Sequence, residues 1–203
     1  MTEHTDKLNT LNQQLSLHDK IHAIHQVIND TFPFVARIAI AIYDAETGLL
    51  KTFIHSSDEH ALEHYQAYID DVPSLKKLVD KGLPRVINKF LTFEHSDSEH
   101  NKRLGRQGYA ASYTLPIFNN GEFFGFIFFN ANQTDVFNEQ VLQQIDLYGH
   151  MIALMVINET NLIHTLSAAV KTTGRITHIR DPETGSHLDR MSRYSRLIAL
   201  TIA

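Results

Sequence analysis

Apolar residues recur at every third and then fourth position through a long stretch near the end of the chain, residues 138–180. This spacing places one side chain per turn on the same face of an α-helix. No proline interrupts the stretch, so the pattern predicts a single helix roughly 60 Å long. The members of this apolar series are Ile145, Tyr148, Ile152, Met155, Glu159, Leu162, Leu166, Ala169, Thr173 and Ile176.

The apolar series has two interpretations. A heptad pattern sustained over this length is typical of a two-stranded coiled coil that extends from a globular domain, so we expect a homodimer formed through residues 138–180. Alternatively, the series is one face of a single helix packed on its own domain. Only Glu159 and Thr173 interrupt its apolar character, and two packing registers could be close in energy at these polar positions.

The long helix is predicted to end at Asp181-Pro182, because proline disfavours the α conformation in the residue before it and has no N–H. The same pair is typical of the start of a new helix, with Asp181 as N-cap. In that helix Glu183 and His187 are four residues apart and share a face. Its apolar pattern continues to Ala203, so we expect the sequence to be a piece of a longer protein.

The first two thirds of the chain mixes helical and strand patterns. Residues 1–31 carry a loose amphipathic stripe that predicts an N-terminal helix. Asn119-Asn120-Gly121 predicts a hairpin turn, since its glycine accepts a positive φ. Strands are predicted at 35–43, 49–55, 84–88, 109–118 and 122–130, helices at 58–71 and 74–79, and a loop or mobile helix at 92–106.

This order of elements predicts an α+β fold, in which an antiparallel sheet is flanked by helices. The domain organisation that follows has four parts. They are an N-terminal helix (1–31), the core of a globular domain (32–137), the long helix (138–180) and the first helix of a further domain (181–203).

Composition narrows the possible partners and location. The net charge is −5, which gives no reason to expect nucleic acid or an anionic membrane as a partner. No apolar run approaches the ~20 residues that a membrane helix needs, and the N-terminus does not resemble a signal peptide. We therefore expect a cytoplasmic protein. Cysteine is absent, which excludes disulfides, thiolate metal sites and a thioether-linked chromophore.

Histidine is abundant, with 13 residues in the chain. His18, His22 and His25 fall on one helical face, as do His60 and His64, and such spacing can bind zinc. Neither group has further ligands close in sequence. We therefore interpret both as polar helix faces.

Residues 20–160 resemble a GAF domain, a small-molecule sensing module of signalling proteins. The resemblance lies in "SLKKLVDKGLPRVIN" (74–88), in the hairpin "GYAASYTLPIFNNGEFFGFIFF" (108–129) and in Phe137 before the long helix. It implies a GAF-like antiparallel sheet, a long C-terminal signalling helix and a pocket for an unknown small molecule between the sheet and the helices above it. Candidate pocket residues are Phe53, Tyr65, Tyr68, Leu78, Phe90, Tyr113 and Phe126, each of which could instead be ordinary core.

The segment "RDPETGSHLDRMSRYSRLIA" (180–199) resembles the first signature of the HD-GYP phosphodiesterases, which hydrolyse cyclic di-GMP with two or three metal ions, commonly iron. The resemblance implies that Glu183 and His187 are metal ligands in the parent enzyme. The family's later His-Asp pair, histidines and Gly-Tyr-Pro loop are missing from this chain. We therefore expect an incomplete metal site, no bound cofactor and no catalytic activity in this fragment.

Together the two resemblances imply the regulatory sensor region of a cyclic di-GMP phosphodiesterase. A ligand at the GAF domain would act through the dimeric helix on the metal site beyond Asp181. Two alternatives remain open. The domain is a scaffold that only dimerises, its pocket filled by side chains, or it is a binding module of a degenerate HD-GYP protein.

Overall fold

The computed structural model describes residues 5–56, 66–89 and 108–202. Its contacts divide the chain into two compact units, Met1–Val156 and Ile157–Ala203. In chain order the elements are η1 (Asn9–Asn12), α1 (Leu17–Thr31), β1 (Val35–Asp44), β2 (Leu49–His55), β3 (Gln66–Tyr68), η2 (Ile69–Asp71), α2 (Pro73–Lys81), β4 (Arg85–Ile87), β5 (Ala111–Asn119), β6 (Glu122–Ala131), α4 (Glu139–Arg180) and α5 (Pro182–Ile202).

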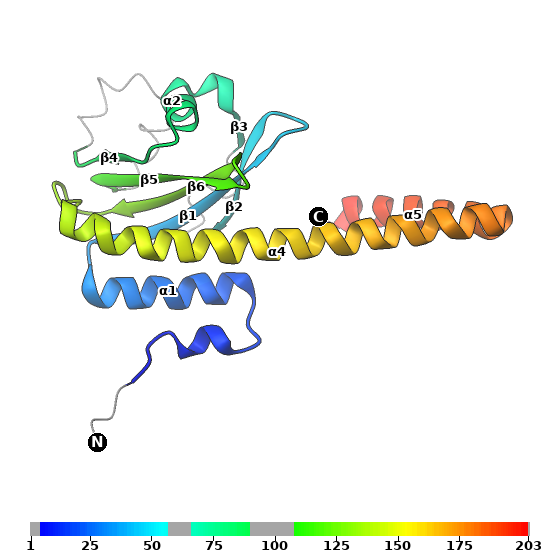
Figure 1. The fold of residues 1–203 in the computed structure, drawn as a ribbon, viewed down its shortest axis with the longest axis horizontal. Coiled ribbons are helices and arrows are strands. Elements are labelled where there is room, and N and C mark those ends of the chain that lie inside the picture. Colours follow the sequence, from blue (N-terminus) through cyan, green and yellow to red (C-terminus); the bar gives the residue numbers. More distant parts are fainter. Residues whose placement is uncertain (1–4, 57–65, 90–107, 203) are drawn as a thin grey trace. The chain divides into compact units, whose positions relative to one another are not determined.

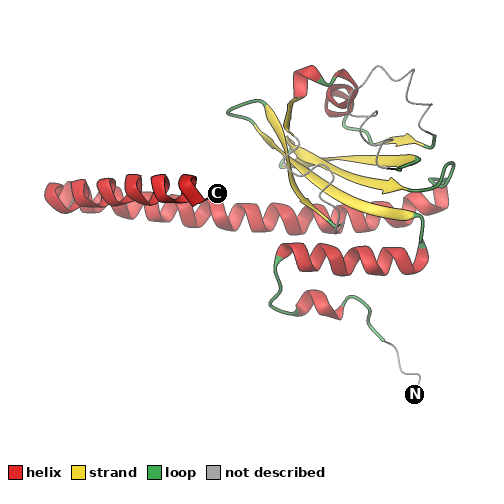
Figure 2. Ribbon diagram, turned by 180° about the vertical axis from the view of Figure 1, so that it is seen from behind, coloured by secondary structure: helices red, strands yellow, loops and turns green. Residues whose placement is uncertain are grey.

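The described strands form a six-stranded antiparallel sheet in the order β3-β2-β1-β6-β5-β4 (Figures 1 and 2). The β5–β6 hairpin turns through Asn120 and Gly121, with φ angles of 51° and 86°. Positive φ at both central positions is the geometry of a type I′ turn, whose twist matches that of the flanking strands. The predicted α+β fold is confirmed.

Alternation along the central strands divides the sheet into two faces. The α4 face carries Ile38, Ile40, Ile127 and Phe129 and is covered by α1 and the first part of α4 (Figure 1). A Cβ at Gly149 of α4 would lie 2.7 Å from Leu115 Cδ2, so this glycine allows the helix to approach the sheet closely. The α2 face carries Ala39, Ala41, Phe126 and Phe128.

The apolar series of the long helix divides at Val156. In the first unit Ile145 and Ile152 are fully buried, so here the helix packs on its own domain. In the second unit Leu162 and Leu166 are 62% and 65% exposed. The first half of the series is therefore not available to a coiled coil, whereas the second half leaves its apolar side chains open to solvent.

The predicted N-terminal helix is wrong in its first half. Residues 13–16 are not helical, and α1 begins after Ser16, whose Oγ accepts a hydrogen bond from the Asp19 N–H at 3.1 Å. A serine N-cap satisfies one of the free N–H groups of the first turn, which favours a helix start at this point. Buried Ile21, Ile24 and Ile28 are the part of the predicted stripe that packs in the core.

The helix predicted at 58–71 is also wrong over its described part. Gln66–Tyr68 pairs with β2 as strand β3, and Ile69–Asp71 is a short 3₁₀ helix. Pairing of the β2 edge satisfies backbone groups that a helix would leave open. Residues 58–65 and the predicted loop at 92–106 lie outside the described residues.

His25 of α1 is buried, so the interpretation of its helix face as polar is wrong at this position. Its Nε2 lies 2.8 Å from the Val35 carbonyl oxygen. Because a carbonyl only accepts hydrogen bonds, Nε2 carries the proton and donates it. Burial in the core lowers the pKa of His25 below the ordinary 6.5, since desolvation disfavours the imidazolium.

This shift predicts that acid destabilises the fold through His25. As the pH falls below 6.5, the unfolded chain binds a proton more readily than the folded chain, so the free energy of unfolding decreases. His25→Gln retains an N–H donor but does not titrate. Between about pH 7.5 and pH 5.5, the thermal midpoint should fall further in the wild type than in this variant. An equal fall in both proteins would contradict the assignment.

Candidate functional site

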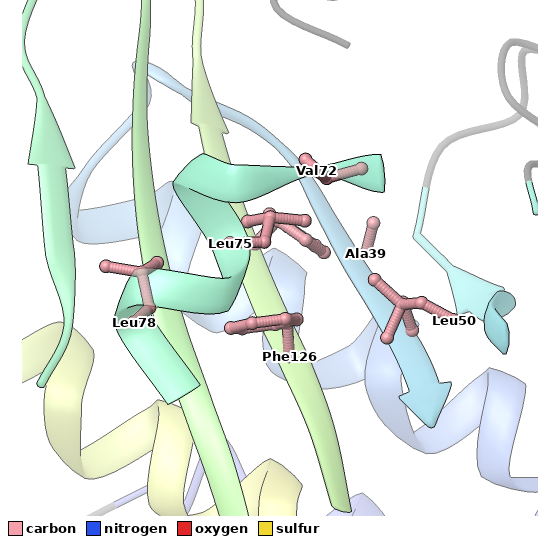
Figure 3. Packing of buried hydrophobic residues seen from close by; sticks show 8 residues of the cluster. Ala39, Leu50, Val72, Leu75, Leu78 and Phe126 are labelled. Carbon is pink, nitrogen blue, oxygen red and sulfur yellow. The ribbon is translucent and has the colours of Figure 1, made fainter. Parts of the chain in front are cut away.

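The apolar part of the α2 face is closely packed. Leu75 and Leu78 of α2 are buried against the sheet, and Figure 3 shows them beside Phe126 of β6. Phe126 also contacts the rings of Phe123 and Phe128, with centroids 5.0 and 5.8 Å apart. This face therefore has a solid hydrophobic layer under α2, and it brings together two of the predicted pocket residues, Leu78 and Phe126.

Two other predicted pocket residues lie at the surface. Phe53 of β2 is 44% exposed and Tyr68 of β3 is 54% exposed. Phe53 falls at a register shift, because Ile40 pairs with Ile54 whereas Ala41 pairs with Thr52. The extra residue of such a bulge is left unpaired, and the regular alternation of side chains breaks there.

Tyr113 is buried on the opposite side of the sheet from Phe126. It pairs with Phe129 on the α4 face, and its hydroxyl donates a hydrogen bond to Asp146 of α4. Burial, together with this carboxylate, raises the pKa of Tyr113. Tyr113 thus joins β5 to α4 and lies away from the α2 face. The remaining predicted pocket residues, Tyr65 and Phe90, lie outside the described residues.

The α2 face becomes polar toward one end of the central strands. Arg37, two residues before Ala39 on β1, pairs with Asn130 of β6, which pairs with Ser112 of β5. Arg37 is only 2% exposed and Asn130 only 1%. The Ser112 hydroxyl donates to Asn130 Oδ1 at 3.0 Å. The other end of the same amide, the Asn130 Nδ2 donor, is buried and has no hydrogen-bond partner.

A second arginine lies on the same face at the edge of the sheet. Arg85 of β4 pairs with Thr114 of β5, which pairs with Phe128. Directly paired residues project to the same side of an antiparallel sheet, so Arg85 shares the α2 face with Arg37. Desolvation lowers the pKa of both guanidinium groups. We call Arg37, Arg85, Ser112 and Asn130 the polar cluster.

Sequence reasoning missed the polar cluster. Its signal was present in the strand "VARIAI", where Arg37 takes an inward position in an otherwise apolar run. A long charged side chain is rarely buried without a partner, so this position was a candidate for function.

The candidate metal ligands lie in α5. Asp181 Oδ1 accepts hydrogen bonds from the N–H groups of Glu183 and Thr184, at 3.1 and 3.2 Å, which confirms the predicted N-cap. These hydrogen bonds, led by the Thr184 hydroxyl, lower the pKa of Asp181. Glu183 and His187 are both exposed on the helix that this cap begins. Within the described ranges, no group of three or more His, Asp or Glu side chains could hold a metal ion.

Gly185 explains how α5 packs against the end of α4. A Cβ at this position would lie 2.5 Å from His178 Cα and 2.3 Å from His178 Nδ1. Because backbone atoms cannot move aside, any larger residue would separate the two helices. The glycine of the signature segment therefore has a packing role here.

The comparisons with known proteins identify the fold. No protein-family model matches the sequence, and no curated protein sequence does. The phycocyanobilin-bound GAF domain of a cyanobacterial phytochrome is similar in structure, with a TM-score of 0.57 and 21% identity over 78% of this chain and 93% of that chain.

Two further GAF structures are also similar. The GAF domain from Acinetobacter phosphoenolpyruvate-protein phosphotransferase gives a TM-score of 0.56 at 12% identity, over 78% of this chain and 92% of that chain. The GAF domain/HD domain protein from Geobacter sulfurreducens gives 0.56 at 14% identity, over 73% and 97%. At these identities the likeness establishes the fold, and this chain has the fold of a GAF domain. Among the described residues, no helix is long and apolar enough to cross a membrane.

The packing under α2 predicts different costs for two phenylalanines. Phe126→Ala should lower the free energy of unfolding by about 3–5 kcal/mol, because it removes a fully buried ring. Phe53→Ala, the matched control at an exposed site, should change it by less than about 0.5 kcal/mol. Urea unfolding followed by circular dichroism measures both. A cost at Phe126 as small as that at Phe53 would mean that Phe126 borders an open cavity.

Proposed function

We propose that this chain is the sensor region of an HD-GYP-type cyclic di-GMP phosphodiesterase. The observation that supports the proposal is the continuity from the GAF fold, through the unbroken helix α4, to a capped helix bearing the signature residues. Asp181, Thr184 and Gly185 each have a definite structural role at the start of α5. That is expected if the segment begins a folded catalytic domain.

Glu183 and His187 have the donor atoms that the proposed metal centre needs. A carboxylate oxygen and an imidazole nitrogen suit iron and other borderline divalent metals, and the i, i+4 spacing places both on one face of α5. Two ligands do not hold a cluster of two or three ions. The remaining ligands would come from the rest of the catalytic domain, and this fragment alone would be inactive.

The proposed partner for the second half of α4 is a second copy of this chain. Leu162, Leu166 and Ile176 of the apolar series are more than half exposed. Apolar side chains at this spacing are those that a two-stranded coiled coil buries. Ligand binding at the GAF domain would then favour one packing of the paired helices over another. Thr173 is a polar position of the apolar series, where two packing registers could be close in energy.

A non-sensing scaffold is the second candidate function. The observation that favours it is the packed layer of Leu75, Leu78 and Phe126, which fills the α2 face under the helix. The polar cluster on the same face has three buried donor atoms without a hydrogen-bond partner. This favours a ligand site, since a scaffold has no use for buried unsatisfied donors. We therefore place the sensor function first.

The proposed function predicts that α5 is required for hydrolysis in the protein extended beyond Ala203. Glu183→Gln and His187→Ala should each lower cyclic di-GMP hydrolysis by about a hundredfold or more, because loss of a ligand should cost at least as much as loss of the groups that orient it. Bound iron should fall in parallel. Asp189→Asn, an exposed acid on the same helix, is the matched control and should retain both. Full activity in the Glu183 and His187 variants would contradict the proposal.

A further inference from the structure

The buried side-chain atoms without a hydrogen-bond partner gather on one face of the sheet. In the described ranges these atoms are Arg37 Nε, Arg85 Nε and Asn130 Nδ2. All three belong to the polar cluster on the α2 face. Each of the three atoms is a hydrogen-bond donor, and two of them belong to positively charged groups. None of the three can accept a hydrogen bond.

Such an arrangement is costly unless something completes it. A buried guanidinium Nε without a hydrogen-bond partner has lost its hydration without gaining an acceptor, and an orphaned amide donor adds a further penalty. Arginine does not escape this cost by losing its proton, because its pKa is too high. None of the ion pairs between described residues includes Arg37 or Arg85. The cluster therefore calls for an acceptor that carries negative charge.

The positions of the arginines indicate the size of this acceptor. Arg37 lies on β1 and Arg85 on β4, with β6 and β5 between them. At 4.7–4.9 Å per strand, their strands are about 14 Å apart. Asn130 and Ser112 lie on the two strands between them, and Arg85 pairs with Thr114, two residues along β5 from Ser112. Long side chains from β1 and β4 can reach toward this middle part of the face. This span suits a small organic molecule better than a single ion.

We propose that the α2 face binds a small organic anion, whose carboxylate or phosphoryl group is held by the guanidinium groups of Arg37 and Arg85. The Asn130 amide donates a further hydrogen bond, and Ser112 orients that amide. Planar guanidinium groups match carboxylate and phosphate oxygens in pairs, which makes arginine a suitable residue for this recognition. The inference rests on the proposed sensor function only in taking this anion as the signal that the domain detects.

Calorimetric titration of residues 1–203 with citrate and with inorganic phosphate, at constant ionic strength, tests the proposal. We expect saturable binding of at least one probe. Arg37→Met and Arg85→Met should each weaken it about tenfold or more, because each removes charge-assisted hydrogen bonds. Arg193→Met, at an exposed arginine of α5, is the matched control and should leave the affinity unchanged. Preference for citrate assigns a carboxylate ligand, and preference for phosphate assigns a phosphoryl ligand.

A stability measurement without added anion separates binding from a purely structural role. If Arg37 awaits a ligand, Arg37→Met removes a buried charge whose Nε has no hydrogen-bond partner, and the variant should unfold at the same temperature as the wild type or higher. The proposal is overturned if neither probe binds, if Arg37→Met and Arg85→Met bind as tightly as the wild type, or if Arg37→Met strongly destabilises the protein without anion.

This test is independent of catalysis. Specific anion binding together with no role for Glu183 and His187 in hydrolysis would contradict the proposed enzyme and leave the anion site intact. If no anion binds but cyclic di-GMP hydrolysis depends on Glu183 and His187, the anion site is contradicted and the proposed enzyme stands.

Discussion

The register between β1 and β6 is the constraint on which the rest of the first unit depends. From Arg37↔Asn130 to Ile42↔Gly125 these central strands pair without a shift, and side chains alternate between the faces at every residue. With this register, Ile38 and Ile127 face α1 and α4, whereas Arg37 and Asn130 face the side of α2. A slip of one residue would place a charged and an amide side chain under α4 and move the isoleucines to the α2 face. The same pairing thus determines both the core and the candidate site.

Close packing on the α4 face positions the long helix. Gly149 brings α4 close to Leu115 and Phe129, and the Tyr113 hydroxyl bonds to Asp146 of the same helix. The helix is thereby held to the sheet through its first turns. Beyond Val156 the apolar residues Leu162 and Leu166 are exposed, and in our proposal a second chain buries them. The part of α4 that packs on the sheet and the part that would dimerise are then different segments of one helix.

Local signals in the sequence were sufficient for much of the fold. The Asn120-Gly121 turn, the Asp181-Pro182 break and the strand runs each depend on a few neighbouring residues, and each was predicted correctly. Features that depend on distant pairing were not. Gln66–Tyr68 is a strand because the edge of β2 is available, and the burial of Ile145 and Ile152 depends on packing between α4 and the sheet of the first unit.

The candidate site shows the same limit. The sequence marks aromatic residues, but the face on which each one lies depends on register and bulges. Tyr113 and Phe126 are on opposite faces although both belong to one hairpin, and Phe53 is exposed at a bulge. The polar cluster was missed because its four residues come from four different strands, β1, β4, β5 and β6. Only the fold brings them together.

Native mass spectrometry of residues 1–203 purified from cells tests the central claim most directly, because one spectrum reports both the stoichiometry and any retained small molecule. The account predicts a dimer in which each chain retains a small organic acid that is released on denaturation. A monomer without added mass would contradict it. In that case the exposed half of α4 does not pair, and Arg37 and Arg85 do not hold a ligand.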